Sequence, residues 1–103
     1  VYMQVVSSTV DSEEFPTGFA LNQNYPNPFN PTTTIPFTIV SPQHVSLDIY
    51  TVDGKFIENL YNKFTSTGYY NITWNATDLP SGVYVIKLTT DKGFTIKKLT
   101  LLK

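Results

Sequence analysis

The sequence predicts an all-β protein, an immunoglobulin-like antiparallel β-sandwich of six or seven strands. Short segments of alternating apolar and polar residues recur at a spacing of roughly ten residues with turn residues between them, which is the pattern of a sandwich. Aromatic residues make up 15% of the 103 residues, and flat rings favour the pleated surface of a sheet. Because short turns and no intervening helices join these segments, neighbouring strands are expected to pair antiparallel.

The chain is expected to divide into an N-terminal part, residues 1–18, and the sandwich, residues 19–103. Val1–Val6 alternates weakly, so it is either a first strand or the tail of a preceding domain. Residues 7–18 are polar and acidic, with one proline and one glycine, which indicates a linker. Its acidic side chains suit a solvated linker better than a metal or acid–base site.

Six strands are predicted within the sandwich. They are Thr34–Ile39, Val45–Tyr50, Phe56–Tyr61, Tyr70–Trp74, Tyr84–Leu88 and Phe94–Leu102. Alternation assigns core-facing residues to four of them. These are Ile35, Phe37 and Ile39; Val45, Leu47 and Ile49; Tyr70, Ile72 and Trp74; and Tyr84, Ile86 and Leu88. Pro36 lacks an N–H donor, which predicts that the first of these strands lies at a sheet edge.

Turn residues separate the predicted strands. Asp53-Gly54 is a strong signal for a two-residue hairpin turn. The other expected turns and loops are Ser41–His44, Thr65–Gly68, Thr77–Gly82 and Asp91–Gly93.

The segment Leu21–Thr33 interrupts this pattern, because three prolines alternate with three asparagines around two aromatic residues. Neither a helix nor a central strand tolerates prolines this dense, so an extended, irregular arm is expected. A polyproline II path would place the asparagines on one edge, where their amides can bond unpaired backbone groups. Tyr25 and Phe29 are the expected anchors onto the core. The arm is predicted to brace the sandwich through Asn24, Tyr25, Pro26, Asn27, Pro28, Phe29, Asn30 and Pro31.

The segment Lys97–Lys103 is an apolar strand with lysines at both ends. Such lysines act as gatekeepers that keep an edge strand from pairing with other chains. A receptor could also recognise the same edge by adding a strand to it. Because Lys97 and Lys98 are adjacent, either one of them faces inward or a bulge intervenes.

Together these features resemble the type A C-terminal sorting domain of the type IX (Por) secretion system, over roughly Phe19 to Lys103. The resemblance is carried by the arm, Ile49-Tyr50 before Asp53-Gly54, Gly68-Tyr69 ahead of Trp74, Ser81-Gly82-Val83-Tyr84, and the terminal Lys98 with Leu101-Leu102-Lys103. It implies an immunoglobulin-like fold and a folded secretion signal that directs an N-terminal cargo across the outer membrane to the cell surface.

The resemblance also implies partners and site residues. An outer-membrane translocon would recognise Lys98, Leu99, Leu101, Leu102 and Lys103. A sortase-like surface peptidase would then cut the domain from its cargo, in the flexible linker where backbone is extended and unpaired. The linker residues expected to be cleaved are Ser7, Ser8, Thr9, Val10, Asp11, Ser12, Glu13 and Glu14.

Composition argues against several other classes of function. Seven Lys and Arg against eight Asp and Glu give a net charge of −1, too little basic surface for nucleic acid or an anionic membrane. Every basic residue is Lys, which weakens bidentate phosphate or carboxylate recognition. The absence of cysteine excludes disulfides, thiolate catalysis and cysteine-based zinc sites. No apolar run reaches the ~20 residues of a membrane helix, and Val1–Gln4 lacks the basic start of a signal peptide.

No enzyme, cofactor or metal site is predicted. His44 is the only histidine, and it lies in a proline-containing turn without an evident partner to orient it as a base. No nucleophile-elbow, zincin or phosphate-loop motif occurs. Asp53, Asp78 and Asp91 could offer oxygens to Ca²⁺, but aspartates are expected in turns because their side chains cap them.

The alternative function is a non-catalytic carbohydrate-binding or structural accessory module of a secreted enzyme. Tyr50, Tyr61 and Tyr69 are the candidates for outward-facing rings that stack on sugars. Tyrosine is also common on strands for packing reasons alone. An edge strand with few charges could in addition pair with a second copy of the chain.

Overall fold

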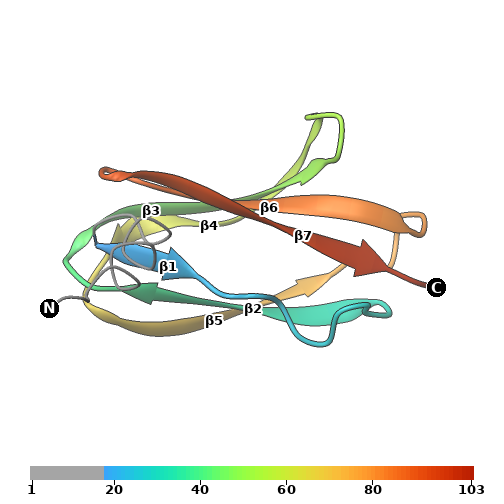
Figure 1. Ribbon diagram of the computed structural model, residues 1–103, viewed down its shortest axis with the longest axis horizontal. Helices are drawn as coiled ribbons and strands as arrows, with labels where there is room; N and C mark the ends of the chain where they lie inside the picture. Colours follow the sequence, from blue (N-terminus) through green and yellow to red (C-terminus); the bar gives the residue numbers. More distant parts are fainter. Residues whose placement is uncertain (1–17) are drawn as a thin grey trace, which may run out of the picture.

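The computed structural model describes residues 18–103, and these form a seven-stranded, two-layered all-β domain (Figure 1). The prediction of an immunoglobulin-like sandwich is confirmed. Val1–Val6 and the linker residues 7–17 lie outside the described residues. Residues 18–103 contain no helix that is long and apolar enough to cross a membrane.

One layer is a three-stranded sheet in the order β1-β2-β5, and the other is a four-stranded sheet in the order β4-β3-β6-β7. All neighbouring strands pair antiparallel. The strands are β1 (Phe19–Leu21), β2 (Thr32–Ile39), β3 (Gln43–Thr51), β4 (Phe56–Thr65), β5 (Gly68–Asn75), β6 (Gly82–Thr90) and β7 (Gly93–Leu101). Because the chain changes layer between β2 and β3, β4 and β5, and β5 and β6, each sheet contains strands that are distant in sequence.

The core lies between the two sheets and is made by alternate residues of the strands. Every core-facing residue predicted on β2, β3 and β6 is buried, as is Trp74 on β5, while Tyr70 and Ile72 are half-buried against the core. The Phe37 ring stacks on Tyr70 with centroids 5.2 Å apart. Trp74 packs against Tyr84 at 5.8 Å, and its Nε1–H donates to Glu58 Oε1 at 3.2 Å. These contacts join the buried residues of both sheets into one continuous core.

The position of β2 differs from the prediction, because it lies between β1 and β5 rather than at an edge. The Pro36 carbonyl accepts a hydrogen bond from the Asn22 N–H at 3.0 Å. In a strand the nitrogen and carbonyl of one residue point to the same side. The missing donor of Pro36 therefore faces the place where β1 has just ended, so the proline costs no bond within either ladder.

Two further details correct the predicted strand list. The seventh strand is the three-residue β1, which the alternation pattern did not reveal. The turn at Asp53-Gly54 is also longer than two residues, because Thr51 N–H donates to Lys55 O at 2.8 Å across it. Gly54 has a φ of +94° there, in the region that favours glycine. The Thr51 hydroxyl donates to the Asp53 carboxylate in the same turn.

Candidate recognition surface at the end of the chain

The arm is hydrogen-bonded to the outer edge of β7, the terminal strand. Phe29 and Leu101 form a parallel bridge. In that bridge Phe29 N–H donates to Thr100 O at 2.9 Å, and Leu102 N–H donates to Phe29 O at 2.9 Å. Phe29 thus extends the four-stranded sheet by one residue beyond its edge strand β7.

Side chains of the arm continue this cover in both directions. Asn27 Oδ1 accepts from Thr100 N–H at 2.9 Å, and Gln23 Nε2 donates to Lys98 O at 2.9 Å. The Lys98 carbonyl, both main-chain groups of Thr100 and the Leu102 N–H therefore have partners in the arm. A receptor could add a strand at these positions only if the arm left them.

The three asparagines of the arm do not share one environment. Asn24 is buried, and its Nδ2 donates to Thr33 Oγ1 at 2.9 Å and to Pro26 O at 3.2 Å. Asn27 reaches β7 instead, and Asn30 is exposed. The expectation that they line one edge is wrong. The expectation that arm amides bond backbone groups holds for the first two.

Only one of the two predicted anchors is buried. The Phe29 ring is 2% exposed and lies 5.6 Å from the Trp74 ring, so it enters the core between the sheets. Tyr25 is 55% exposed, and the arm is held at this point by main-chain bonds between Tyr25 and Thr34 of 2.8 and 2.9 Å. The prediction of Tyr25 as an anchor is therefore wrong. Pro26 and Pro28 are exposed, whereas Pro31 is half-buried and its carbonyl accepts from Ala76 N–H at 2.8 Å.

The five predicted terminal residues separate into two groups. Leu99 and Leu101 are fully buried in the core, whereas Lys98, Leu102 and Lys103 are exposed. Lys103 is bonded to the β5–β6 loop, because its N–H donates to Ser81 Oγ at 3.0 Å and its Nζ donates to Thr77 O.

Lys97 and Lys98 point to opposite sides of β7. The β6–β7 register runs without a shift from Gly82 and Leu101 to Thr90 and Gly93, so no bulge is present. Lys97 alternates with Leu99 and Leu101 and is half-buried, whereas Lys98 lies on the outer face. Of the two alternatives offered by the sequence, the inward-facing lysine is the one that the structure adopts.

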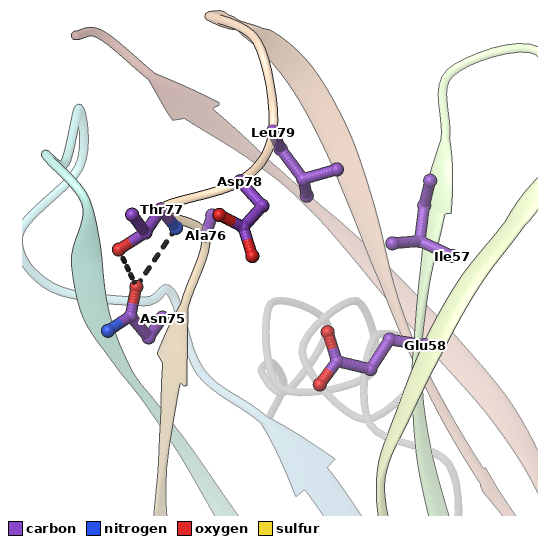
Figure 2. A pocket seen from close by; sticks show the side chains of 7 residues that line it. All are labelled: Ile57, Glu58, Asn75, Ala76, Thr77, Asp78 and Leu79. Carbon is purple, nitrogen blue, oxygen red and sulfur yellow. Dashed lines mark hydrogen bonds between the residues drawn. The ribbon is translucent and has the colours of Figure 1, made fainter.

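A depression of about 320 Å³ lies between β4 and the β5–β6 loop. Figure 2 shows the carboxylates of Glu58 and Asp78 pointing into it from opposite walls. Asn75 Oδ1 accepts from Thr77 N–H at 2.9 Å and shapes the loop, which contributes Ala76 and Leu79 to the lining. Two carboxylates are its only charged groups. Within residues 18–103, no three His, Cys, Asp or Glu side chains gather in a geometry for a metal ion.

The candidates for other chemistry are scattered. Asp53, Asp78 and Asp91 lie in three different loops. His44 Nε2 lies 2.5 Å from Asn62 Oδ1, an amide rather than a carboxylate. Tyr61 packs edge-on against Phe37 at 5.5 Å, so it is not an outward-facing ring.

The two remaining tyrosines of the sugar-binding alternative lie on opposite faces of the sandwich. Tyr69 is 87% exposed on the three-stranded sheet, and Tyr50 is half-buried on the outer face of the four-stranded sheet. They therefore form no common stacking platform.

Comparison with known proteins identifies the domain. Residues 23–102 match the family model described as the secretion system C-terminal sorting domain. The matched span includes most of the arm and all strands from β2 to β7. No curated protein matches this chain.

Proposed function

This chain belongs to the family of secretion system C-terminal sorting domains, and from that premise we propose how it is recognised. The domain is a type IX secretion signal, which directs export across the outer membrane to the cell surface or the medium. The family is a signal domain and not a catalytic one. It implies interaction with the type IX machinery and an N-terminal cargo in the same precursor.

The translocon recognises the exposed residues of the terminal segment, Lys98, Leu102 and Lys103, while Leu99 and Leu101 hold that segment on the core. The observation that carries this assignment is the division of the segment into buried and exposed side chains. A receptor that meets a folded domain can touch only the exposed group. The backbone edge of the same segment is occupied by the arm, which favours readout of side chains over strand addition.

The arm from Asn24 to Pro31 has a bracing role in this scheme. It is bound to β2 by the buried Asn24 and to β7 by Phe29 and Asn27, so it connects the two sheets along one side. Each such hydrogen bond contributes about 1 kcal/mol net. The burial of the Phe29 ring adds about 2–3 kcal/mol.

After export, a sortase-like surface peptidase removes the domain from its cargo. The cut falls within residues 7–14, a polar stretch of the kind that proteases prefer. Mass spectrometry of the released cargo identifies the bond, and a cut inside residues 19–103 would contradict this assignment.

Pairing with a second copy, if it occurs, uses β5. This edge strand runs for eight residues without a charge, a proline or a register shift, whereas the β4 edge contains bulges and a lysine. Charges, prolines and bulges are the devices that normally protect an edge.

A reporter secretion assay tests the recognition proposal. A periplasmic reporter is fused to this domain in a bacterium with a type IX system, and its distribution between periplasm and medium is measured. Removal of residues 98–103 leaves the reporter in the periplasm. The double variant Lys98→Glu, Leu102→Ser does the same without unfolding the domain, since both side chains are exposed. The matched control Lys92→Glu, in the exposed β6–β7 turn, is secreted normally. Normal export of the truncated fusion would refute the proposal.

A further inference from the structure

The outer face of the four-stranded sheet carries a continuous apolar surface. Tyr50, Val85 and Lys98 lie side by side across β3, β6 and β7. Ile96 lies two residues before Lys98 on the same face of β7. Ile96 is 51% exposed and Phe56 is 54% exposed. The Phe56 ring packs edge-on against the Tyr50 ring, with their centroids 5.7 Å apart. We call this surface the apolar face. It consists of Tyr50, Val52, Phe56, Val83, Val85 and Ile96.

The apolar face is hollowed at its centre. A depression of about 340 Å³ is lined by Tyr50, Val52, Val85 and Ile96, with Lys87 and the β3–β4 turn at its border. Exposed apolar side chains that adjoin one another on a monomer mark interaction sites, whereas single ones need no explanation. Phe94, 58% exposed, lies on the same face of β7 two residues before Ile96, and Lys87 Nζ lies 4.6 Å from the centre of its ring. Phe64 and Tyr69, also exposed, stand apart from this surface, the first opposite His44 on β4 and the second on the other sheet.

The border of the apolar face carries charges of both signs. Lys55 in the adjoining turn, Lys87 and Lys98 lie at this border, and Lys55 and Lys98 are exposed. Asp48 is the cross-strand partner of Lys87, and Asp53 lies in the same turn as Lys55. Lys98 has Val85 rather than an acid as its cross-strand partner. The complementary surface would therefore present apolar side chains with a carboxylate opposite Lys98.

We propose that the apolar face is the principal docking surface for the type IX machinery, and that its partner is a protein surface of apolar side chains with a carboxylate that meets Lys98. The inference rests on the proposed function, which it extends from the terminal residues to three neighbouring strands. It is carried by the continuity of this face with Lys98. The buried Leu99 and Leu101 act as the support that fixes β7, and thus Ile96 and Lys98, in the plane of the sheet.

Aspartate substitutions test the proposal in the reporter secretion assay. Phe56→Asp and Ile96→Asp each place a charge in the apolar face. Phe64→Asp and Tyr69→Asp place the same charge on exposed rings elsewhere, the first of them on the same strand as Phe56. Loss of one docked apolar side chain lowers export by about tenfold, with intact reporter in the periplasm. Both controls export within about twofold of the unchanged domain, because a solvent-exposed substitution away from an interface has little effect.

Thermal unfolding of the four purified variants shows whether a loss of export reflects lost docking or an unfolded domain. All four melt within a few degrees of one another, since each replaced side chain is more than half exposed. If Phe56→Asp or Ile96→Asp unfolds the domain, Phe56→Ser and Ile96→Ser replace them. Export of the folded face variants at the level of the controls overturns the proposal. The failure is distinguishable from failure of the proposed function, because the folded double variant Lys98→Glu, Leu102→Ser reports the proposed function without loss of the buried Leu99 and Leu101.

Two other occupants give different results. If the purified domain is a dimer that Ile96→Asp converts to a monomer, the face binds a second copy. If it sediments with phosphatidylglycerol vesicles and Ile96→Asp abolishes this, the face binds lipid. Either result overturns the assignment to a protein of the secretion machinery.

Discussion

Phe29 and Leu101 lie side by side in a parallel bridge, and both side chains are buried in the same core. The pairing joins the arm near the start of the domain to its last strand. It also places a residue of the arm where the sheet would otherwise end in an open edge. Several expected properties follow from this single contact.

Phe29→Ala is expected to destabilise the domain by about 3–5 kcal/mol, because a buried ring against Trp74 is lost and a cavity remains. Tyr25→Ala, four residues earlier in the same arm, removes an exposed ring and changes stability by about 0.5 kcal/mol or less. Urea unfolding at equilibrium measures both. Equal losses for the two variants would contradict the assignment of Phe29 as the anchor.

Hydrogen exchange separates the two contacts of the arm with β7. Thr100 N–H is held by the Asn27 side chain, and Leu102 N–H is held by the Phe29 backbone. Asn27→Ala therefore accelerates exchange at Thr100 and leaves Leu102 protected, as measured by NMR. Acceleration at both amides to the same degree would mean that the arm leaves the edge as one unit.

Asn24→Ala is expected to cost about 1–3 kcal/mol, because Thr33 and the Pro26 carbonyl lose a partner in a largely buried place. Asn30→Ala, at an exposed position of the same arm, is the matched control and should be near neutral. Denaturant midpoints give the comparison. A neutral Asn24→Ala would show that the arm does not depend on this buried amide.

The adjacent leucines at the end of β7 should respond in opposite ways. Leu101→Ala removes a fully buried side chain and lowers stability by about 2–5 kcal/mol. Leu102→Ala removes an exposed one and leaves stability within about 0.5 kcal/mol, while it reduces export of a reporter. Stability is read from urea unfolding and export from the secretion assay. An exported, fully stable Leu102→Ala would remove this residue from the recognition surface.

The Asp53 carboxyl offers a pH-dependent readout. The hydrogen bond from Thr51 holds the pKa of Asp53 below its usual value, with smaller help from its backbone and Lys55. Thr51→Val should raise this pKa toward the usual value, as followed by NMR titration. A carboxyl with a depressed folded pKa stabilises the fold above its unfolded pKa, and that contribution is lost as pH falls through the folded pKa. An unchanged titration would mean that the hydroxyl does not hold the carboxylate.

The alternation of apolar residues predicted most of the core, because side chains in a strand change face at every residue. The alternation pattern could not predict three other features of the fold. The strand β1 has only three residues, too few for a period to appear. Pro36 suggested an edge strand, but β2 is a central strand. Its missing N–H faces the residue just after β1 ends, so neither ladder loses a hydrogen bond. Tyr25 and Phe29 are equivalent as aromatic residues of the arm, and only the path of the backbone makes one buried and the other exposed.

The candidate surface was predictable in part. The alternation that buries Leu99 and Leu101 also turns Lys98 outward, so the sequence already contained that division. The cover of the β7 edge was not visible, because it depends on main-chain groups of two segments that are distant in sequence. The apolar face depends on strand order, since Tyr50, Val85 and Ile96 meet only after β3, β6 and β7 are placed side by side.

The bridge between the arm and β7 also bears on the order of events during synthesis. The ribosome makes the arm before any strand from β2 onward, yet the segment that the arm covers is the last part of the domain to emerge. A nascent chain that stops within β7 leaves Phe29 without its partner and the sheet incomplete. The surface around Lys98 is therefore complete only after β7 has been synthesised, because a chain that stops before Leu101 lacks the strand that covers the Phe29 ring.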